Sequence, residues 1–226
     1  MSTGPEGGVA QALSCHAHRR VIGALGLALP VLLYISAGVL HVDEVEPWRL
    51  LRSVSSYYHT GAVGVFVGIL FALSLSLFTY RGYKDVAADR ILGFLGGAAA
   101  SALAFFPGNP PKGTVPPDWW RPWMNDVHVG SAVVLFGVFV LFSLWLFRKG
   151  DGEHRRDRSA RKRCRDNIYL ACGIVIGLCV VVVAVFMTLD WPIVVPECGA
   201  IVAFSVSWLV KGDAVRWCRD RPSSGT

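Results

Sequence analysis

Seven residues of this 226-residue chain have side chains that could bind a ligand or carry chemistry within an otherwise apolar sequence. They are histidines, tyrosines and carboxylates, and each falls at the edge of a long apolar stretch. Ionisable groups at such depths are costly unless they are paired, so by default they mark a functional site. These candidate ligand-binding residues are His41, Tyr57, Tyr58, His59, Asp126, His128 and Glu197.

Three of these residues could form a metal site. Imidazole and carboxylate are a usual pair of zinc ligands, so His59, His128 and Glu197 are the candidates if a metal binds at all. Structural roles explain the same residues equally well. Asp126 could satisfy the free amides at the start of a helix, and Glu197 could sit in a first helical turn, where the helix dipole favours a carboxylate. The sequence therefore leaves the metal content open and requires no cofactor.

Motifs of the common enzyme classes are missing from the sequence. There is no P-loop, no G-x-S-x-G, no H-E-x-x-H and no G-x-G-x-x-G at a strand-to-helix turn. The close histidine pair His16-Ala-His18 lies in the N-terminal segment, whereas alkaline ceramidases carry His-x-x-x-His in their last helix. Binding of a lipid, a small molecule or a membrane partner is therefore favoured. A metal-dependent intramembrane hydrolase acting on a lipid and a small transporter are the alternatives.

Long apolar stretches must position these side chains. Hydrophobic residues make up 53% of the chain, and a membrane-spanning helix needs about 20 apolar residues. We expect an all-α bundle of six transmembrane helices, residues 21–211, between cytoplasmic tails of residues 1–20 and 212–226. The expected spans are residues 21–40, 61–80, 86–106, 127–147, 168–189 and 193–210.

The basic residues predict the orientation of these spans. With the N-terminus inside, 18 of the 22 Lys and Arg residues fall on the cytoplasmic side, as the positive-inside rule requires. We therefore expect a multi-pass protein of the cytoplasmic (inner) membrane with both termini in the cytoplasm. The basic run Arg155 to Arg165 is then explained by topology and by attraction to anionic lipid headgroups, without a nucleic-acid partner.

Two further regions favour contact with membrane lipids. The outer segment of residues 106–126 holds six of the twelve prolines and three of the eight tryptophans, and it is either an interfacial segment or a lid over an outward-facing cavity. At the inner side, aromatic and long basic side chains are typical anchors at the headgroups. The candidate lipid headgroup residues there are Arg81, Lys84, Trp208 and Lys211.

Small residues and a regular spacing predict which helix faces turn inward. Gly93, Gly96, Gly97 and Ala100 would let the third span approach its neighbours closely. The stripe of Glu197, Ile201, Ser205 and Trp208 should face the interior of the bundle along the sixth span. The oligomeric state stays open between a monomer, a homo-oligomer and a complex with another membrane protein.

Several segments resemble a group of uncharacterised bacterial multi-pass membrane proteins. The resemblance covers residues 21–212 and implies a six-helix fold, distantly similar to that of the DRAM and Frag type, without implying a reaction. The segments that carry it are Ser53–Thr60, Val65–Gly68, Tyr80–Tyr83, His128, Glu197 and Ser207–Gly212.

Overall fold

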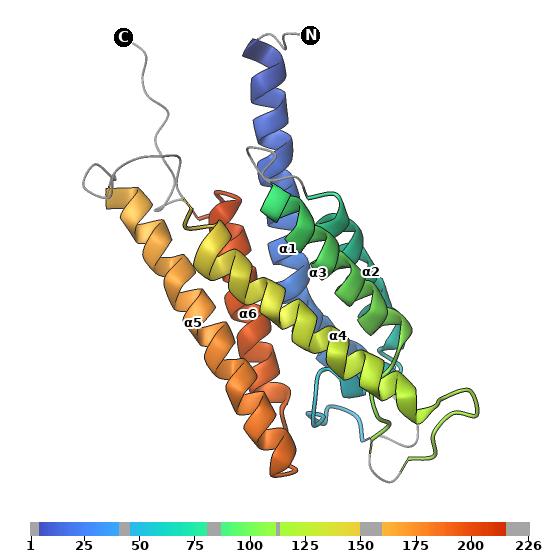
Figure 1. Cartoon of the computed structure of the whole chain (residues 1–226). Helices are drawn as coiled ribbons and strands as arrows, with labels where there is room; N and C mark the ends of the chain where they lie inside the picture. Colours follow the sequence, from blue (N-terminus) through green and yellow to red (C-terminus); the bar gives the residue numbers. More distant parts are fainter. Residues whose placement is uncertain (1–4, 41–45, 81–86, 112–113, 150–159, 216–226) are drawn as a thin grey trace.

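The computed structural model is a bundle of six long helices joined by loops and two short helical turns (Figure 1). It describes residues 5–40, 46–80, 87–111, 114–149 and 160–215, and these contain no strand. His41, Arg81 and Lys84 lie outside the described residues. The elements are α1 (Pro5–Val39), η1 (Ser55–His59), α2 (Val63–Phe78), α3 (Ala87–Phe105), α4 (Pro122–Leu141), η2 (Phe142–Leu146), α5 (Ala160–Thr188) and α6 (Val194–Lys211).

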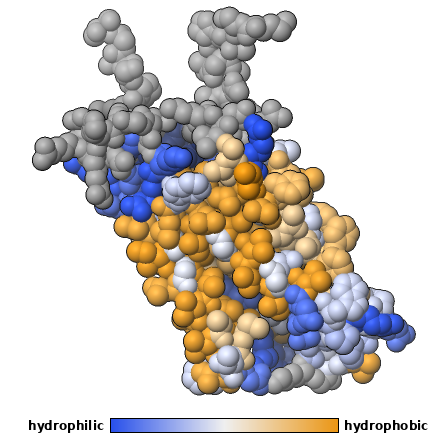
Figure 2. Space-filling model, viewed as in Figure 1, coloured by the Kyte–Doolittle hydropathy of each residue, from blue (hydrophilic) through white to orange (hydrophobic). Residues whose placement is uncertain are grey.

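Five of the helices are long and apolar enough to cross a membrane, within Cys15–Val39, Ala87–Phe105, Pro122–Leu146, Lys162–Thr188 and Val194–Lys211. The sixth, α2, is a shorter apolar helix of 16 residues, or about 24 Å at 1.5 Å per residue. Figure 2 shows a hydrophobic surface over the middle of the bundle, with hydrophilic residues gathered toward its two ends. The protein is therefore an all-helical, multi-pass membrane protein.

Each of the six predicted spans coincides with a helix, but three helices begin earlier than expected, among them α5, which starts at Ala160 instead of residue 168. Helix α1 starts at Pro5, inside the segment predicted to be a tail, and α4 starts at Pro122 instead of residue 127. Proline is favoured at the first position of a helix because its missing N–H would be unpaired there anyway. Asp126 consequently lies beyond the first turn of α4 and does not cap it.

Close packing against α3 occurs where the sequence predicted it. Gly93, Gly96, Gly97 and Ala100 are all buried. A Cβ atom added at Gly93 would lie 2.7 Å from the carbonyl oxygen of Leu77, so the backbones of α2 and α3 are nearly in contact. The predicted interior face of the third span is confirmed.

The inward stripe of α6 is confirmed as well. Ile201 is 8% exposed, and Ser205 and Trp208 are fully buried. At the same level, α4 loosens into the π-helical turn η2, where the hydroxyl group of Ser143 donates to that of Ser207 on α6 at 3.1 Å. The same stripe carries Glu197, one helical turn before Ile201, on the inward face of α6 near the start of that helix.

Candidate functional site

The loop before η1 crosses the first turn of α6 and fixes that end of the bundle. The backbone N–H groups of Ile193 and Val194 donate to the carbonyl oxygen of Arg52, at 2.7 and 2.9 Å. The Arg52 side chain donates to both the carbonyl oxygen and the carboxylate of Asp190, the latter at 3.0 Å. The bonds to the Arg52 carbonyl satisfy free amides at the start of α6 and place Val54, two residues further on, next to that helix.

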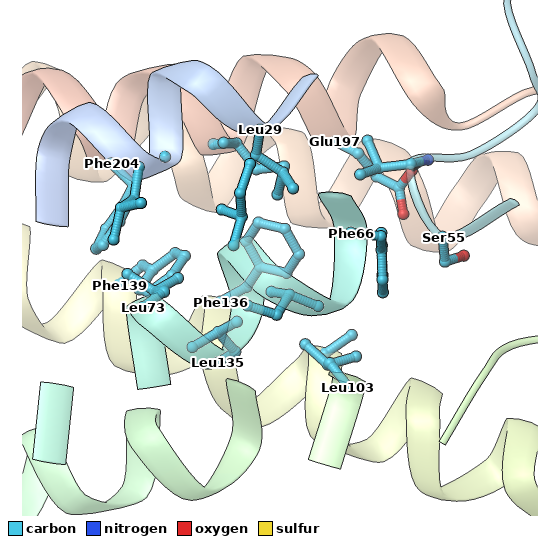
Figure 3. Close-up of a pocket in the computed structure, with 17 residues that line it drawn as sticks. Leu29, Ser55, Phe66, Leu73, Leu103, Leu135, Phe136, Phe139, Glu197 and Phe204 are labelled. Atoms are coloured by element: carbon cyan, nitrogen blue, oxygen red, sulfur yellow. Dashed lines mark hydrogen bonds between the residues drawn. The ribbon is translucent and has the colours of Figure 1, made fainter. Parts of the chain in front are cut away.

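Glu197 is bound directly by that loop. The backbone N–H of Val54 donates to Oε2 of Glu197 at 2.7 Å, across 143 residues of sequence. A bond from an N–H to a charged acceptor is among the stronger hydrogen bonds in proteins. The contact fixes the carboxyl group beside Ser55, and Figure 3 shows it directed into the space between Ser55 and the ring of Phe66.

That space is a partly open cavity of about 70 Å³ inside the bundle. Its walls come from five of the long helices and are apolar, with Leu29, Leu70, Leu103 and Phe136 among the lining side chains. Only two polar side chains, those of Ser55 and Glu197, line it, and both lie at the end beneath η1. The cavity is therefore amphipathic, with one polar end and a long apolar body.

Hydroxyl groups extend the polar end toward η1. The Oγ atom of Ser53 lies 3.0 Å from that of Ser55 and 2.7 Å from that of Ser56. Ser53 Oγ also accepts the backbone N–H of Ser56 at 3.1 Å, which fixes the turn. The hydroxyl group of Ser55 is therefore held in position by a hydrogen bond with that of Ser53.

Two histidines of the predicted site lie within the described residues, and both bind backbone carbonyl groups in the segment of residues 106–126. His59 donates through Nε2 to the carbonyl oxygen of Gly108 at 3.1 Å, and Trp120 donates to the same oxygen at 3.2 Å. His128 donates through Nδ1 to the carbonyl oxygen of Phe106 at 2.7 Å. Burial lowers the pKa of His59 below its ordinary value, although the bond to Gly108 opposes this. The two histidines therefore hold residues 106–108 against η1 and α4.

Three further members of the predicted set lie apart from the cavity. Tyr57 is buried, Tyr58 packs edge-on against Phe66 at 5.7 Å between ring centres, and neither lines the cavity. Burial raises the pKa of both phenol groups. Asp126 is exposed on α4. Among the described residues, no three His, Cys, Asp or Glu side chains are grouped so that they could hold a metal ion, so His59, His128 and Glu197 do not form a common metal site here.

At the other end of the bundle, the described headgroup candidates contact protein groups. Trp208 is fully buried, and its ring lies 4.9 to 5.1 Å from the rings of Tyr80, Phe142 and Phe147, so its indole presents no surface to a lipid. The Nζ atom of Lys211 donates to the carbonyl oxygen of Phe147 at 3.4 Å. Trp208 and Lys211 therefore both contact neighbouring parts of the protein and contribute to the packing of α6.

Sequence reasoning missed Arg19, which is fully buried beside this aromatic cluster. Its Nη2 donates to the hydroxyl of Tyr80 at 3.3 Å, and its guanidinium carbon lies 5.7 Å from the centre of that ring. Asp89 on α3 lies within electrostatic range. The signal was present, because Arg19 precedes the buried Ile22 by three residues on the same face of α1.

Sequence reasoning also missed Ser55 and the cavity itself, since neither has a local pattern.

Comparisons with known proteins identify no family model, no curated protein and no solved structure that matches this chain.

Proposed function

We propose that this protein binds a lipid chain or another small amphipathic molecule in the cavity beneath η1. The observation that carries the proposal is the pairing of an apolar cavity with one polar end formed by Glu197 and Ser55. Ligand sites are typically concave and apolar with a few placed polar groups, as this one is. A volume of about 70 Å³ is room for roughly five water molecules, yet the walls offer them few hydrogen bonds, so an apolar occupant is favoured.

The proposal includes the membrane arrangement. Six spans, including the short α2, would place both termini in the cytoplasm and the cavity's polar end toward the outer face of the inner membrane, as the positive-inside rule favours. A bilayer can adapt to a short helix by local thinning, which makes α2 compatible with a span. The resemblance to uncharacterised bacterial multi-pass membrane proteins, distantly similar to the DRAM and Frag type, implies the same number of helices.

Retained ligand is the test of the proposal. We expect protein extracted in mild detergent to carry a lipid or small amphiphile that native mass spectrometry detects. Ala132 lines the cavity, whereas its neighbour Val133 is 63% exposed on α4. Ala132→Phe should fill the cavity and reduce the bound fraction, and Val133→Phe should leave it unchanged.

Two outcomes would contradict the proposal. One is a wild-type protein that carries no ligand and takes none up from added lipid extract. The other is an equal loss of ligand in both variants, which would locate binding on the outer surface of α4 and not in the cavity. Thermal unfolding of both variants serves as the control for correct folding.

A further inference from the structure

The carboxyl group at the polar end of the cavity restricts what the ligand's head can be. Glu197 has one hydrogen-bond partner among the described residues, the N–H of Val54, and no basic side chain forms an ion pair with it there. Arg52, which is close in the loop, is bound to Asp190. The carboxyl group of Glu197 therefore has no cationic partner among the described residues, and a ligand head could supply one.

A carboxylate at this depth is costly unless it is paired with a cation or accepts several hydrogen bonds. A buried carboxyl group without such a partner holds a proton and stays neutral, so a neutral or an anionic head would gain only a hydrogen bond from it. An amine would take up that proton, and the resulting ammonium group would pair with the carboxylate and could also donate to the hydroxyl of Ser55. The ring of Phe66 lies close to the carboxyl group of Glu197 in Figure 3 and forms an apolar wall of the cavity there.

The apolar body of the cavity restricts the tail. Along α6 the lining runs from Glu197 to Phe204, about 10 Å at 1.5 Å per residue. The cavity volume of about 70 Å³ is small for two acyl chains side by side. One narrow chain can enter the cavity and bury its first methylene groups against Leu, Ile and Phe side chains, while the rest of a longer chain leaves through the open side of the cavity.

From these limits we infer that the cavity selects a single-chain amphiphile whose head is a protonated amine. The inference rests on the proposed function, because it concerns the same cavity. It adds the class of ligand, an alkyl amine in place of a fatty acid or a neutral alcohol.

Three probes with the same ten-carbon chain test the selectivity: decylamine, decanol and decanoate. Their dissociation constants are measured by calorimetry at pH 7.5 in a nonionic detergent, with titrations into empty micelles subtracted. We expect decylamine to bind about tenfold or more tightly than decanol, the range expected for a hydrogen bond to a charged group. Decanoate should bind most weakly.

Glu197→Gln is the decisive variant, because glutamine keeps an oxygen that accepts the Val54 N–H but removes the charge. It should lose the advantage of decylamine while decanol binds as before, which also shows that the cavity is intact. The matched control is Glu46→Gln, since Glu46 is an exposed carboxylate in the same loop, 3.6 Å from Arg49. This control should keep the wild-type preference.

The outcomes separate the two proposals. Equal binding of decylamine and decanol to the wild type would overturn the inference and leave ligand binding in place. The inference also fails if Glu197→Gln keeps the preference, or if Glu46→Gln loses it, since the preference would then come from the general surface charge. Failure of all three probes to bind would contradict the proposed function itself.

Discussion

The close approach of α2 and α3 makes the replacement of Gly93 by alanine a sensitive test of the fold. An added Cβ would lie 2.7 Å from the carbonyl oxygen of Leu77 and 3.6 Å from that of Tyr80. Both obstacles are backbone atoms, so no side-chain rotation can relieve the contact. To reach an ordinary contact of 3.4 Å, the two backbones must separate by about 0.7 Å.

Gly68→Ala is the matched control, because a Cβ at Gly68 on α2 meets nothing within 4 Å. Both substitutions gain about 0.8–1 kcal/mol of helix propensity, since alanine loses less backbone entropy than glycine in a helix. Overpacking of a close contact costs about 1–3 kcal/mol, and only Gly93→Ala incurs it. The free energy of unfolding should therefore differ by about 1–3 kcal/mol between the two variants, with Gly93→Ala the less stable.

Thermal unfolding in one detergent, followed by tryptophan fluorescence, measures this difference. At about 2–4 °C per kcal/mol for a chain of this size, Gly93→Ala should melt several degrees below Gly68→Ala. Gly97→Ala should fall between them, because its nearest obstacle, at 2.8 Å, is the side chain of Phe78, which is 40% exposed and can shift more readily than a backbone. Equal melting temperatures for Gly93→Ala and Gly68→Ala would refute the close backbone contact.

Three more predictions address pH, the buried cation and the topology. The pKa of His59 is lowered by burial from its ordinary 6.5, so the unfolded chain takes up this proton at a higher pH than the folded one. Melting temperatures should therefore fall as the pH drops below 6.5, and less steeply in His59→Gln; parallel profiles would contradict this assignment. Tyr80→Phe removes the hydroxyl that accepts from buried Arg19 and should cost about 1–3 kcal/mol of unfolding free energy, so an unchanged melting temperature would argue against that bond. In a cysteine-free background, an impermeant thiol reagent on intact cells should modify a cysteine at Thr114 and not one at Ala214, and the opposite pattern would reverse the topology.

The features that were predictable from sequence are those that depend on local spacing. Six apolar stretches, the small residues of α3 and the stripe of Ile201, Ser205 and Trp208 each follow from helical periodicity within one segment. The start of α1 was misplaced because a polar N-terminal segment gives no sign of continuing a helix. That error also hid Arg19, which was counted among tail residues although it lies in α1 and is buried.

Trp208 shows the limit of composition as a guide to position in a membrane. A tryptophan near the end of a span, three residues before Lys211, has the composition of an interfacial anchor. Its actual place depends on which way α6 is turned, and the inward stripe carries the indole into a cluster of aromatic rings. The inward stripe predicts a buried Trp208, whereas the anchor pattern predicts an exposed one. The packing of α6 agrees with the stripe.

The same distinction explains the fate of the predicted polar site. Sequence fixes how deep a residue lies along its helix, and by that measure His59, His128 and Glu197 belong together. It does not fix the direction in which each side chain points, since that depends on contacts such as the one between Val54 and Glu197, 143 residues apart. Those contacts turn Glu197 into the cavity, while both histidines donate to carbonyl groups of the outer segment. The two histidines therefore hold the segment of residues 106–108, whereas Glu197 at the same depth lines the cavity, so a change at either histidine should first affect that segment and reach the cavity only through η1.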